Sequence, residues 1–219
     1  MLRWIIEWFV EFDKKALLYL NGLHSPEWDK VMWWITDNNS RNWIPLYVVL
    51  LIVIIYRERP YRFIFTILFV AITVVLCDQI SVLIKNLVER PRPTHDSGIA
   101  DLVHIIVNAD YPNGYRGGQY GFVASHAANV FGTATFLSNQ FKHYKWTLFL
   151  YAWAVIVSYS RIYLGVHYPL DILCGALLGT LIGIQCYVFK VRTAVYIERR
   201  IDWRIRRKKR NKKLQTKNS

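Results

Sequence analysis

The chain has 219 residues, of which 53% are hydrophobic and 16% aromatic, and its formal net charge is +13. This length suits a single domain, and the composition excludes a disordered chain, a collagen-like repeat and a disulfide-rich secreted scaffold. Residues 190–219 carry thirteen Lys and Arg against two acidic side chains, so this segment holds +11 and the first 189 residues only +2. Nucleic acid is therefore not an expected partner, because a nucleic-acid-binding module carries its basic patch on the folded body.

Residues 1–42 predict two short helices, the first of them amphipathic and lying at a membrane interface. Apolar side chains repeat there with a helical period, at Trp4, Ile5, Trp8, Phe9, Phe12, Ala16, Tyr19 and Leu20. Charged residues fall mostly on the opposite side, as in helices that lie on a membrane surface. Ser25 and Pro26 are typical of a helix start, so a second helix is expected after them. A sixth membrane-spanning segment is the alternative for this region.

Five apolar segments follow, at 43–56, 63–85, 122–140, 146–163 and 169–189. Crossing a bilayer takes about 20 residues. The sequence therefore predicts an all-α membrane bundle over residues 43–189, with five to six transmembrane helices and an outer loop over 89–121. In the last segment Gly175, Gly179 and Gly183 recur at every fourth position, which indicates close packing against another helix.

Basic residues between these segments predict the orientation. They precede the second segment, separate the third from the fourth (Lys142 and Lys145) and fill residues 190–219. All three regions lie on one side if the spans alternate, and basic short loops stay in the cytoplasm. We therefore expect a cytoplasmic tail over residues 190–219 that contacts anionic lipid headgroups. The loop 89–121 would then face the periplasm from a bacterial inner membrane.

Polar residues recur at the outer ends of the predicted spans: Lys85 and Arg92, Ser125 and His126, Ser160 and Arg161, His167 and Asp171. Cations gathered on the outer face would repel one another unless an anion lay between them. An arginine fork matches phosphate oxygens, and a lysine adds a point charge. These residues predict a phosphate-binding site.

The histidines add reactivity to that site. His167 and Asp171 are four positions apart at the start of a helix, so they share a face. A carboxylate on one ring nitrogen fixes the tautomer and leaves the other nitrogen free as a nucleophile or base. His126, from another segment, could protonate a leaving group. The set predicts phosphoryl transfer with neither a metal nor a cofactor.

The spacing Lys85-x6-Arg92-Pro93, then Ser125-His126, then Ser160-Arg161-x5-His167-x3-Asp171 resembles the three-part signature of the type 2 phosphatidic acid phosphatase superfamily, over about residues 78–179. The resemblance implies that His167 forms a phosphohistidine, that Asp171 orients it and that His126 protonates the leaving oxygen. It also implies that phosphate is bound by Lys85, Arg92 and Arg161, with Ser125 and Ser160.

The second motif departs from the family pattern. The usual Pro-Ser-Gly-His is here Val123, Ala124, Ser125 and His126, so one hydroxyl is lost and another appears one position later. We expect activity to be retained because the cations and both histidines remain.

The expected function is hydrolysis of a phosphate monoester or diphosphate on a lipid. The outer loop resembles that of lipid A phosphatases and undecaprenyl-diphosphate phosphatases, which favours those two substrates. The alternatives are phosphatidic acid or phosphatidylglycerophosphate as substrate, transfer of the phosphoryl group to another lipid, and an inactive lipid-binding scaffold. Two further residues have two expected roles each. Arg116 is expected either to bind a second phosphate or sugar or to lie in a flexible turn. Asp78 is expected either to support Lys85 or to form a hydrogen bond with a neighbouring helix.

Overall fold

The structure is a computed structural model that describes residues 2–36, 44–57 and 60–215. The long elements in these ranges are seven helices: α1 (Leu2–Asn21), α2 (Pro26–Thr36), α3 (Ile44–Arg57), α4 (Pro60–Val88), α5 (Ser125–Phe141), α6 (Tyr144–Tyr163) and α7 (Pro169–Gln215). Two single-turn 3-10 helices, η2 (Pro93–His95) and η3 (Ala100–Leu102), lie in the long loop after α4. The predicted all-α class is confirmed, and each of the five apolar segments contains a helix.

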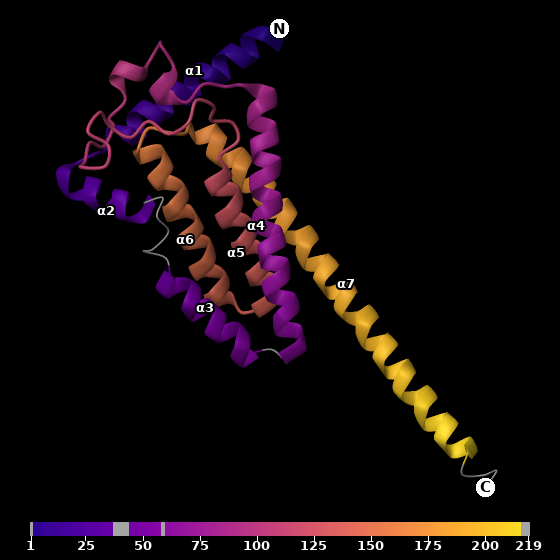
Figure 1. The fold of residues 1–219 in the computed structure, drawn as a ribbon. Helices are drawn as coiled ribbons and strands as arrows, with labels where there is room; N and C mark the ends of the chain where they lie inside the picture. Colours follow the sequence, from indigo (N-terminus) through magenta and orange to yellow (C-terminus); the bar gives the residue numbers. More distant parts are fainter. Residues whose placement is uncertain (1, 37–43, 58–59, 216–219) are drawn as a thin grey trace.

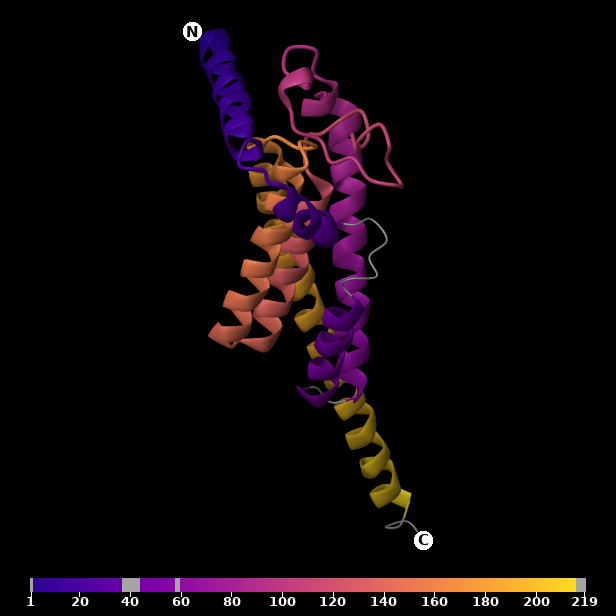
Figure 2. The ribbon, with the colours of Figure 1, turned by 90° about the vertical axis from the view of Figure 1, so that its left-hand side faces the viewer.

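The bundle is arranged around α5, which contacts α4, α6 and α7 (Figure 1). We call the end at which α4 finishes and α7 begins the outer end. There α1, α2 and the long loop cover the bundle, while the turn between α5 and α6 lies at the other end (Figures 1 and 2). α7 runs past the bundle at that other end, so the basic residues from Lys190 onward extend away from the outer end.

Glycine allows α7 to lie directly against α5. A Cβ at Gly175 would lie 2.5 Å from the carbonyl oxygen of Ala124, and one at Gly183 would lie 2.5 Å from that of Gly132. A Cβ at Gly179 would overlap the carbonyl of Ala128. The close packing predicted from the glycine spacing is confirmed, and it brings the starts of α5 and α7 together.

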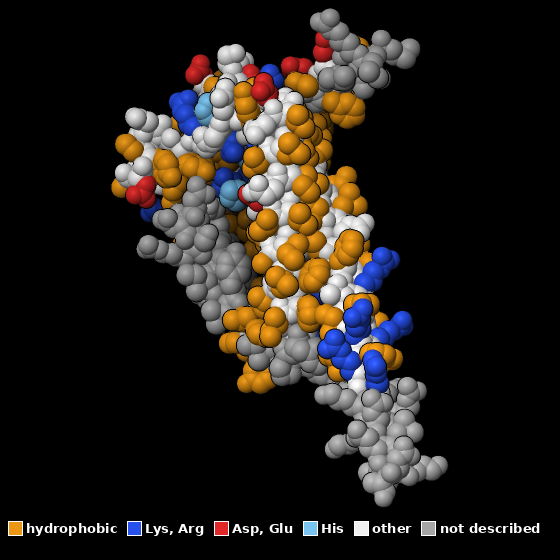
Figure 3. Space-filling view, turned by 45° about the vertical axis from the view of Figure 1, so that its right-hand side comes forward, with side chains coloured by type: hydrophobic (Ala, Val, Ile, Leu, Met, Phe, Trp, Pro, Cys, Tyr) orange, Lys and Arg blue, Asp and Glu red, His pale blue; other side chains and the backbone are white. Residues whose placement is uncertain are grey.

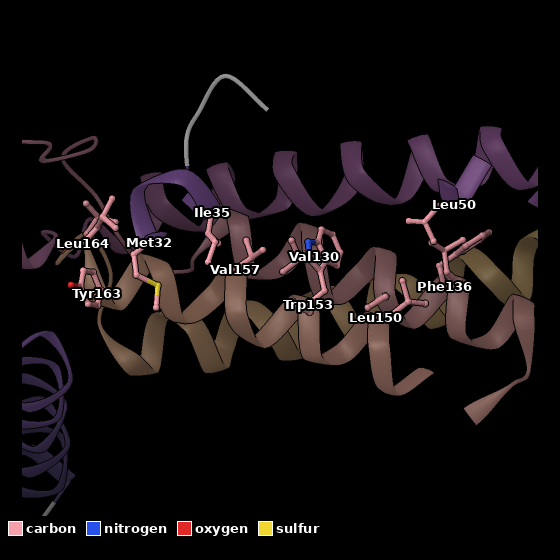
Figure 4. Packing of buried hydrophobic residues seen from close by; sticks show 14 of the residues in the cluster. Met32, Ile35, Leu50, Val130, Phe136, Leu150, Trp153, Val157, Tyr163 and Leu164 are labelled. Carbon is pink, nitrogen blue, oxygen red and sulfur yellow. The ribbon is translucent and has the colours of Figure 1, made fainter. Parts of the chain in front are cut away.

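The main hydrophobic core joins α2 to the bundle. Met32 and Ile35 of α2 belong to the same buried cluster as Val157 of α6 and Val130 of α5 (Figure 4). α2 is therefore held against α6 near the outer end. The cap predicted for α2 is also present, since the Trp28 N–H donates to Ser25 Oγ over 3.4 Å.

α1 presents its apolar stripe to the surroundings. Trp4, Trp8 and Phe12 are 68%, 54% and 57% exposed, whereas Asp13 and Leu17 are 1% and 0% exposed against the bundle. The helix itself is confirmed, and an outward aromatic stripe suits contact with lipid. Its place at the interface stays a prediction.

Apolar side chains also cover the outside of the bundle. Figure 3 shows a broad hydrophobic face over α4 and a group of Lys and Arg side chains on α7 beyond it. Within the described ranges, two helices are long and apolar enough to cross a membrane: Arg62–Val88, with 27 residues, and Pro169–Ile201, with 33. The number of five to six spans stays a prediction, as does the division at residue 189, because α7 continues without a break to Gln215.

Candidate active site

The structure brings the three motif segments together at the outer end. Their residues come from the last turn of α4, the first turn of α5, the last turn of α6, the link before α7 and the first turn of α7: Lys85, Ser125, His126, Arg161, His167 and Asp171. Arg92 reaches the same place from the long loop. The convergence expected from the sequence is therefore present in the geometry.

Arg161 is anchored from both sides although it is only 1% exposed. Its Nη1 donates to Thr36 Oγ1 over 2.5 Å, and its Nη2 donates to the Tyr115 hydroxyl over 3.2 Å. The Nε has no hydrogen-bond acceptor within the described part of the chain. Because a buried guanidinium requires acceptors, this donor suits an anionic oxygen of a ligand.

Arg92 is held by the loop that returns towards α5. Its Nε donates to the Tyr120 carbonyl over 3.1 Å, and its backbone N–H donates to the Gln119 carbonyl over 3.0 Å. Gly117 makes room for it, since a Cβ there would lie 2.6 Å from Arg92 Nη1. Burial and the neighbouring charge of Arg161 lower the pKa of Arg92, but a guanidinium stays charged at any physiological pH.

Lys85 completes the cationic group from α4. Its ammonium donates to Ser125 Oγ, which ties the end of α4 to the first residue of α5. Ser125 is one of the residues that depart from the family pattern, and the structure places its hydroxyl beside a cation of the predicted phosphate site. The first turn of α5 also offers unpaired backbone N–H groups, which favour an anion.

His167 and Asp171 form the pair expected from their spacing. His167 Nδ1 lies 3.5 Å from Asp171 Oδ2, and the two side chains are 1% and 0% exposed. Asp171 Oδ2 also accepts the Tyr168 backbone N–H over 3.0 Å, so the carboxylate is fixed at the start of α7. Nδ1 lies near the carboxylate but makes no hydrogen bond within the described part of the chain. The role of Nε2 as the reactive ring nitrogen stays a prediction.

The charges around His167 favour its neutral form. Burial, followed by the positive charges of Arg92, Arg161 and Lys85, lowers the pKa of His167 well below its usual value of 6.5. His126, the second residue of α5, interacts electrostatically with the same cations and with His167. The site therefore holds two histidines in a positive field, which suits a negatively charged substrate.

Three other predicted residues do not take part in the contacts described above. The Ser160 hydroxyl donates to the Val157 carbonyl of its own helix over 2.7 Å. Arg116 is exposed in the long loop. Asp78 is half-buried on α4 and makes no hydrogen bond to Lys85 within the described ranges, although its negative charge acts on the Lys85 ammonium. Their roles in binding stay predictions.

Four contact residues were missed by sequence reasoning: Asp13, Thr36, Arg90 and Tyr115. Arg90 carried a signal, as an arginine on the outer face, and its Nη1 donates to Asp171 Oδ1 over 2.9 Å. Asp13 gave no distinct signal, because it lies among the charged residues Glu11, Lys14 and Lys15 of a predicted amphipathic helix. Thr36 and Tyr115 gave no signal, because their role depends on packing far along the chain. No group of three or more His, Cys, Asp or Glu side chains is placed to hold a metal ion in the described ranges.

Comparison with known proteins places this site in a family. The family model described as the PAP2 superfamily matches residues 61–194, which includes all three motifs. Lipid A 4'-phosphatase of Bacteroides thetaiotaomicron is 37% identical over 177 residues, covering 80% of this chain and 75% of that protein. Lipid A 4'-phosphatase of Porphyromonas gingivalis is 32% identical over 203 residues, covering 90% of this chain and 78% of that protein.

A solved structure shares the fold. The transmembrane PAP2-type phosphatidylglycerolphosphate phosphatase from Bacillus subtilis aligns with a TM-score of 0.59 at 23% identity, covering 84% of this chain and 87% of that one. At this identity the likeness concerns the fold alone.

Proposed function

The chain belongs to the PAP2 superfamily, and on that premise we propose that this lipid phosphatase removes phosphate from a lipid headgroup through a phosphohistidine intermediate on the periplasmic face of a bacterial inner membrane. The observation that carries the proposal is the convergence of three cations on the His167–Asp171 pair at the outer end of a bundle with an apolar surface. A headgroup phosphate of a lipid in the outer leaflet lies at that depth.

The reaction runs in two displacements. In the first, the Nε2 lone pair of His167 forms a bond to phosphorus, and the bond from phosphorus to the lipid oxygen breaks as His126 gives that oxygen a proton. In the second, His126 takes a proton from water, the water oxygen bonds to phosphorus, and the bond to nitrogen breaks to release phosphate. Asp171 holds the tautomer in which Nε2 is unprotonated.

The cations act on the phosphoryl group in both steps. Lys85, Arg92 and Arg161 neutralise the phosphate oxygens and hold the phosphorus in front of His167. Because these groups are fixed by the fold before substrate arrives, they stabilise developing charge without reorganisation. This part of the proposal is supported by the contacts of Arg161 with Thr36 and Tyr115.

We favour a lipid A phosphate or undecaprenyl diphosphate as substrate. The lipid A 4'-phosphatase names of the two relatives, which match along 80% and 90% of this chain, support the first choice. The basic tail and the charge pattern of the loops support the inner membrane and the periplasmic face.

The test is phosphate release by the purified full-length protein in detergent with EDTA. The substrates are lipid A, undecaprenyl diphosphate, phosphatidic acid and phosphatidylglycerophosphate, and the variant is His167→Ala. His143→Ala is the matched control, because this histidine is exposed at the opposite end of the bundle. We expect release from lipid A or undecaprenyl diphosphate, and a loss of at least about 10³-fold in His167→Ala alone.

Other outcomes assign the alternatives. Labelled phosphate found on an acceptor lipid, rather than free, would make the protein a phosphotransferase. Turnover that stops with EDTA and returns with a metal would contradict the metal-independent mechanism. Tight lipid binding with no turnover of any substrate would favour the scaffold.

A further inference from the structure

Asp13 and Asp171 share one arginine. Arg90 Nη2 donates to Asp13 Oδ2 over 2.7 Å, and Arg90 Nη1 donates to Asp171 Oδ1 over 2.9 Å. Asp13 comes from α1 and Asp171 from the start of α7, and both carboxylates are almost fully buried, at 1% and 0% exposure. A planar guanidinium can engage two carboxylates at once, which an ammonium cannot do with the same geometry.

The contacts of Arg90 and Asp13 continue into the segment that carries His167. The guanidinium of Arg90 lies 4.0 Å from the ring centroid of Tyr168, the residue after His167. Asp13 Oδ1 accepts the backbone N–H of Leu170 over 2.9 Å. The network therefore fixes the segment between His167 and Asp171, at Tyr168 and Leu170, and holds the Asp171 carboxylate itself.

Burying three charged side chains costs folding free energy, which indicates a role beyond packing. Burial raises the pKa of Asp13, and the Leu170 N–H and Arg90 oppose that effect. Replacing buried ion pairs by apolar residues is often neutral or stabilising, so a buried Asp–Arg–Asp set is weak evidence for a role in stability.

We propose that Arg90 and Asp13 are positioning residues of the phosphatase reaction, which hold Asp171 and thereby the ring of His167. The inference rests on the proposed function, in which His167 is the nucleophile. Arg90 pairs with both carboxylates, so its charge neutralises Asp171 only in part. Asp13 therefore controls how much of the negative charge of Asp171 acts on the imidazole of His167. α1 thus contributes a residue to the site from the helix that also carries the outward aromatic stripe.

The opposite charges of Arg90 and Asp13 predict opposite shifts of the pH profile of kcat/KM when each is removed. In Arg90→Gln, Asp171 loses its cation and acts more strongly on His167, so the imidazolium is favoured and the acid limb of kcat/KM moves to higher pH. In Asp13→Asn, the charge of Arg90 neutralises Asp171 more fully. The imidazolium of His167 is then less favoured, so the acid limb moves to lower pH. We expect shifts of roughly 0.5–1 pH unit. Lys85, Arg92, Arg161 and His126 also face His167 and are the same in both variants.

Rate constants separate positioning from substrate binding. Arg90→Lys keeps the charge but reaches only one carboxylate, so kcat should fall about 10- to 100-fold with KM within about twofold. Glu11→Gln is the matched control on α1, because Glu11 is exposed. Asparagine at position 13 still accepts the Leu170 N–H, and thermal unfolding in detergent reports whether each variant is folded.

The outcomes separate this inference from the proposed function. Opposite shifts of the acid limb at unchanged unfolding midpoints support it. If Asp13→Asn, Arg90→Gln and Arg90→Lys all behave as Glu11→Gln while His167→Ala is inactive, the inference is overturned and the proposed function stands. Loss of rate that only follows loss of stability, with no shift of the acid limb, also overturns it. If His167→Ala retains turnover, the proposed function fails first.

Discussion

At the residue scale, burial and charge act on His167 in the same direction. Both penalise the imidazolium, so the pKa of His167 lies well below its usual value of 6.5 and the neutral, nucleophilic ring persists in mildly acidic solution. We therefore expect the acid limb of kcat/KM to have its midpoint below about pH 6.5. The measurement is phosphate release between about pH 4.5 and 8 with the preferred lipid.

The pH midpoint of the acid limb also tests whether His167 is the group that titrates. A midpoint at or above the ordinary histidine value would contradict the positive field described for the site. His143→Ala should leave the profile unchanged, since His143 lies on the exposed surface at the other end of the bundle.

The candidate site could be predicted from sequence where its residues lie in short motifs of fixed spacing. Spacing alone pairs His167 with Asp171, because residues four apart share a helix face. The partnership of Arg90 with Asp13 joins residues 77 positions apart and depends on how α1 packs over the long loop. No local pattern encodes such a contact, and Asp13 sits among charged residues typical of a solvated face.

At the element scale, the packing of α7 on α5 depends on the absence of side chains. We expect Gly179→Val to destabilise the protein by about 1–3 kcal/mol or more, because its Cβ would overlap the carbonyl of Ala128 and the helices would have to separate. Activity should fall as well, because the same packing aligns His126 with His167. The measurement is the thermal unfolding midpoint in detergent.

The control for this prediction lies on the opposite face of α7. Leu177 is 63% exposed, so Leu177→Phe adds volume to the same helix without a clash. A midpoint for Gly179→Val as high as that of Leu177→Phe would contradict the close packing.

The helices themselves could be predicted because apolar runs and caps are local. The end of α7 could not: the charge run from Lys190 suggests a solvated tail, yet the helix continues to Gln215. Lysine and arginine are good helix formers, so charge density alone does not end a helix. The direction of the aromatic stripe on α1 also depends on tertiary packing, since Asp13, Leu17 and Asn21 form the buried face.

At the scale of the whole molecule, the candidate active site and the basic surface residues lie at opposite ends. The candidate site and the loop 89–124 form the outer end, while Lys142, Lys145 and the basic part of α7 lie towards the other. If the basic end is cytoplasmic, the site faces the periplasm. Single-cysteine labelling in intact cells tests this orientation, in a background that lacks Cys77, Cys174 and Cys186.

Two positions report the two ends. Asp101→Cys, exposed in η3, should react with a membrane-impermeant thiol reagent in intact cells. Lys142→Cys, exposed after α5, should react only after the membrane is permeabilised. The reverse pattern would place the site in the cytoplasm, and the substrate would then have to be a lipid of the inner leaflet. Since both positions are exposed, a difference in labelling reports the side of the membrane rather than burial.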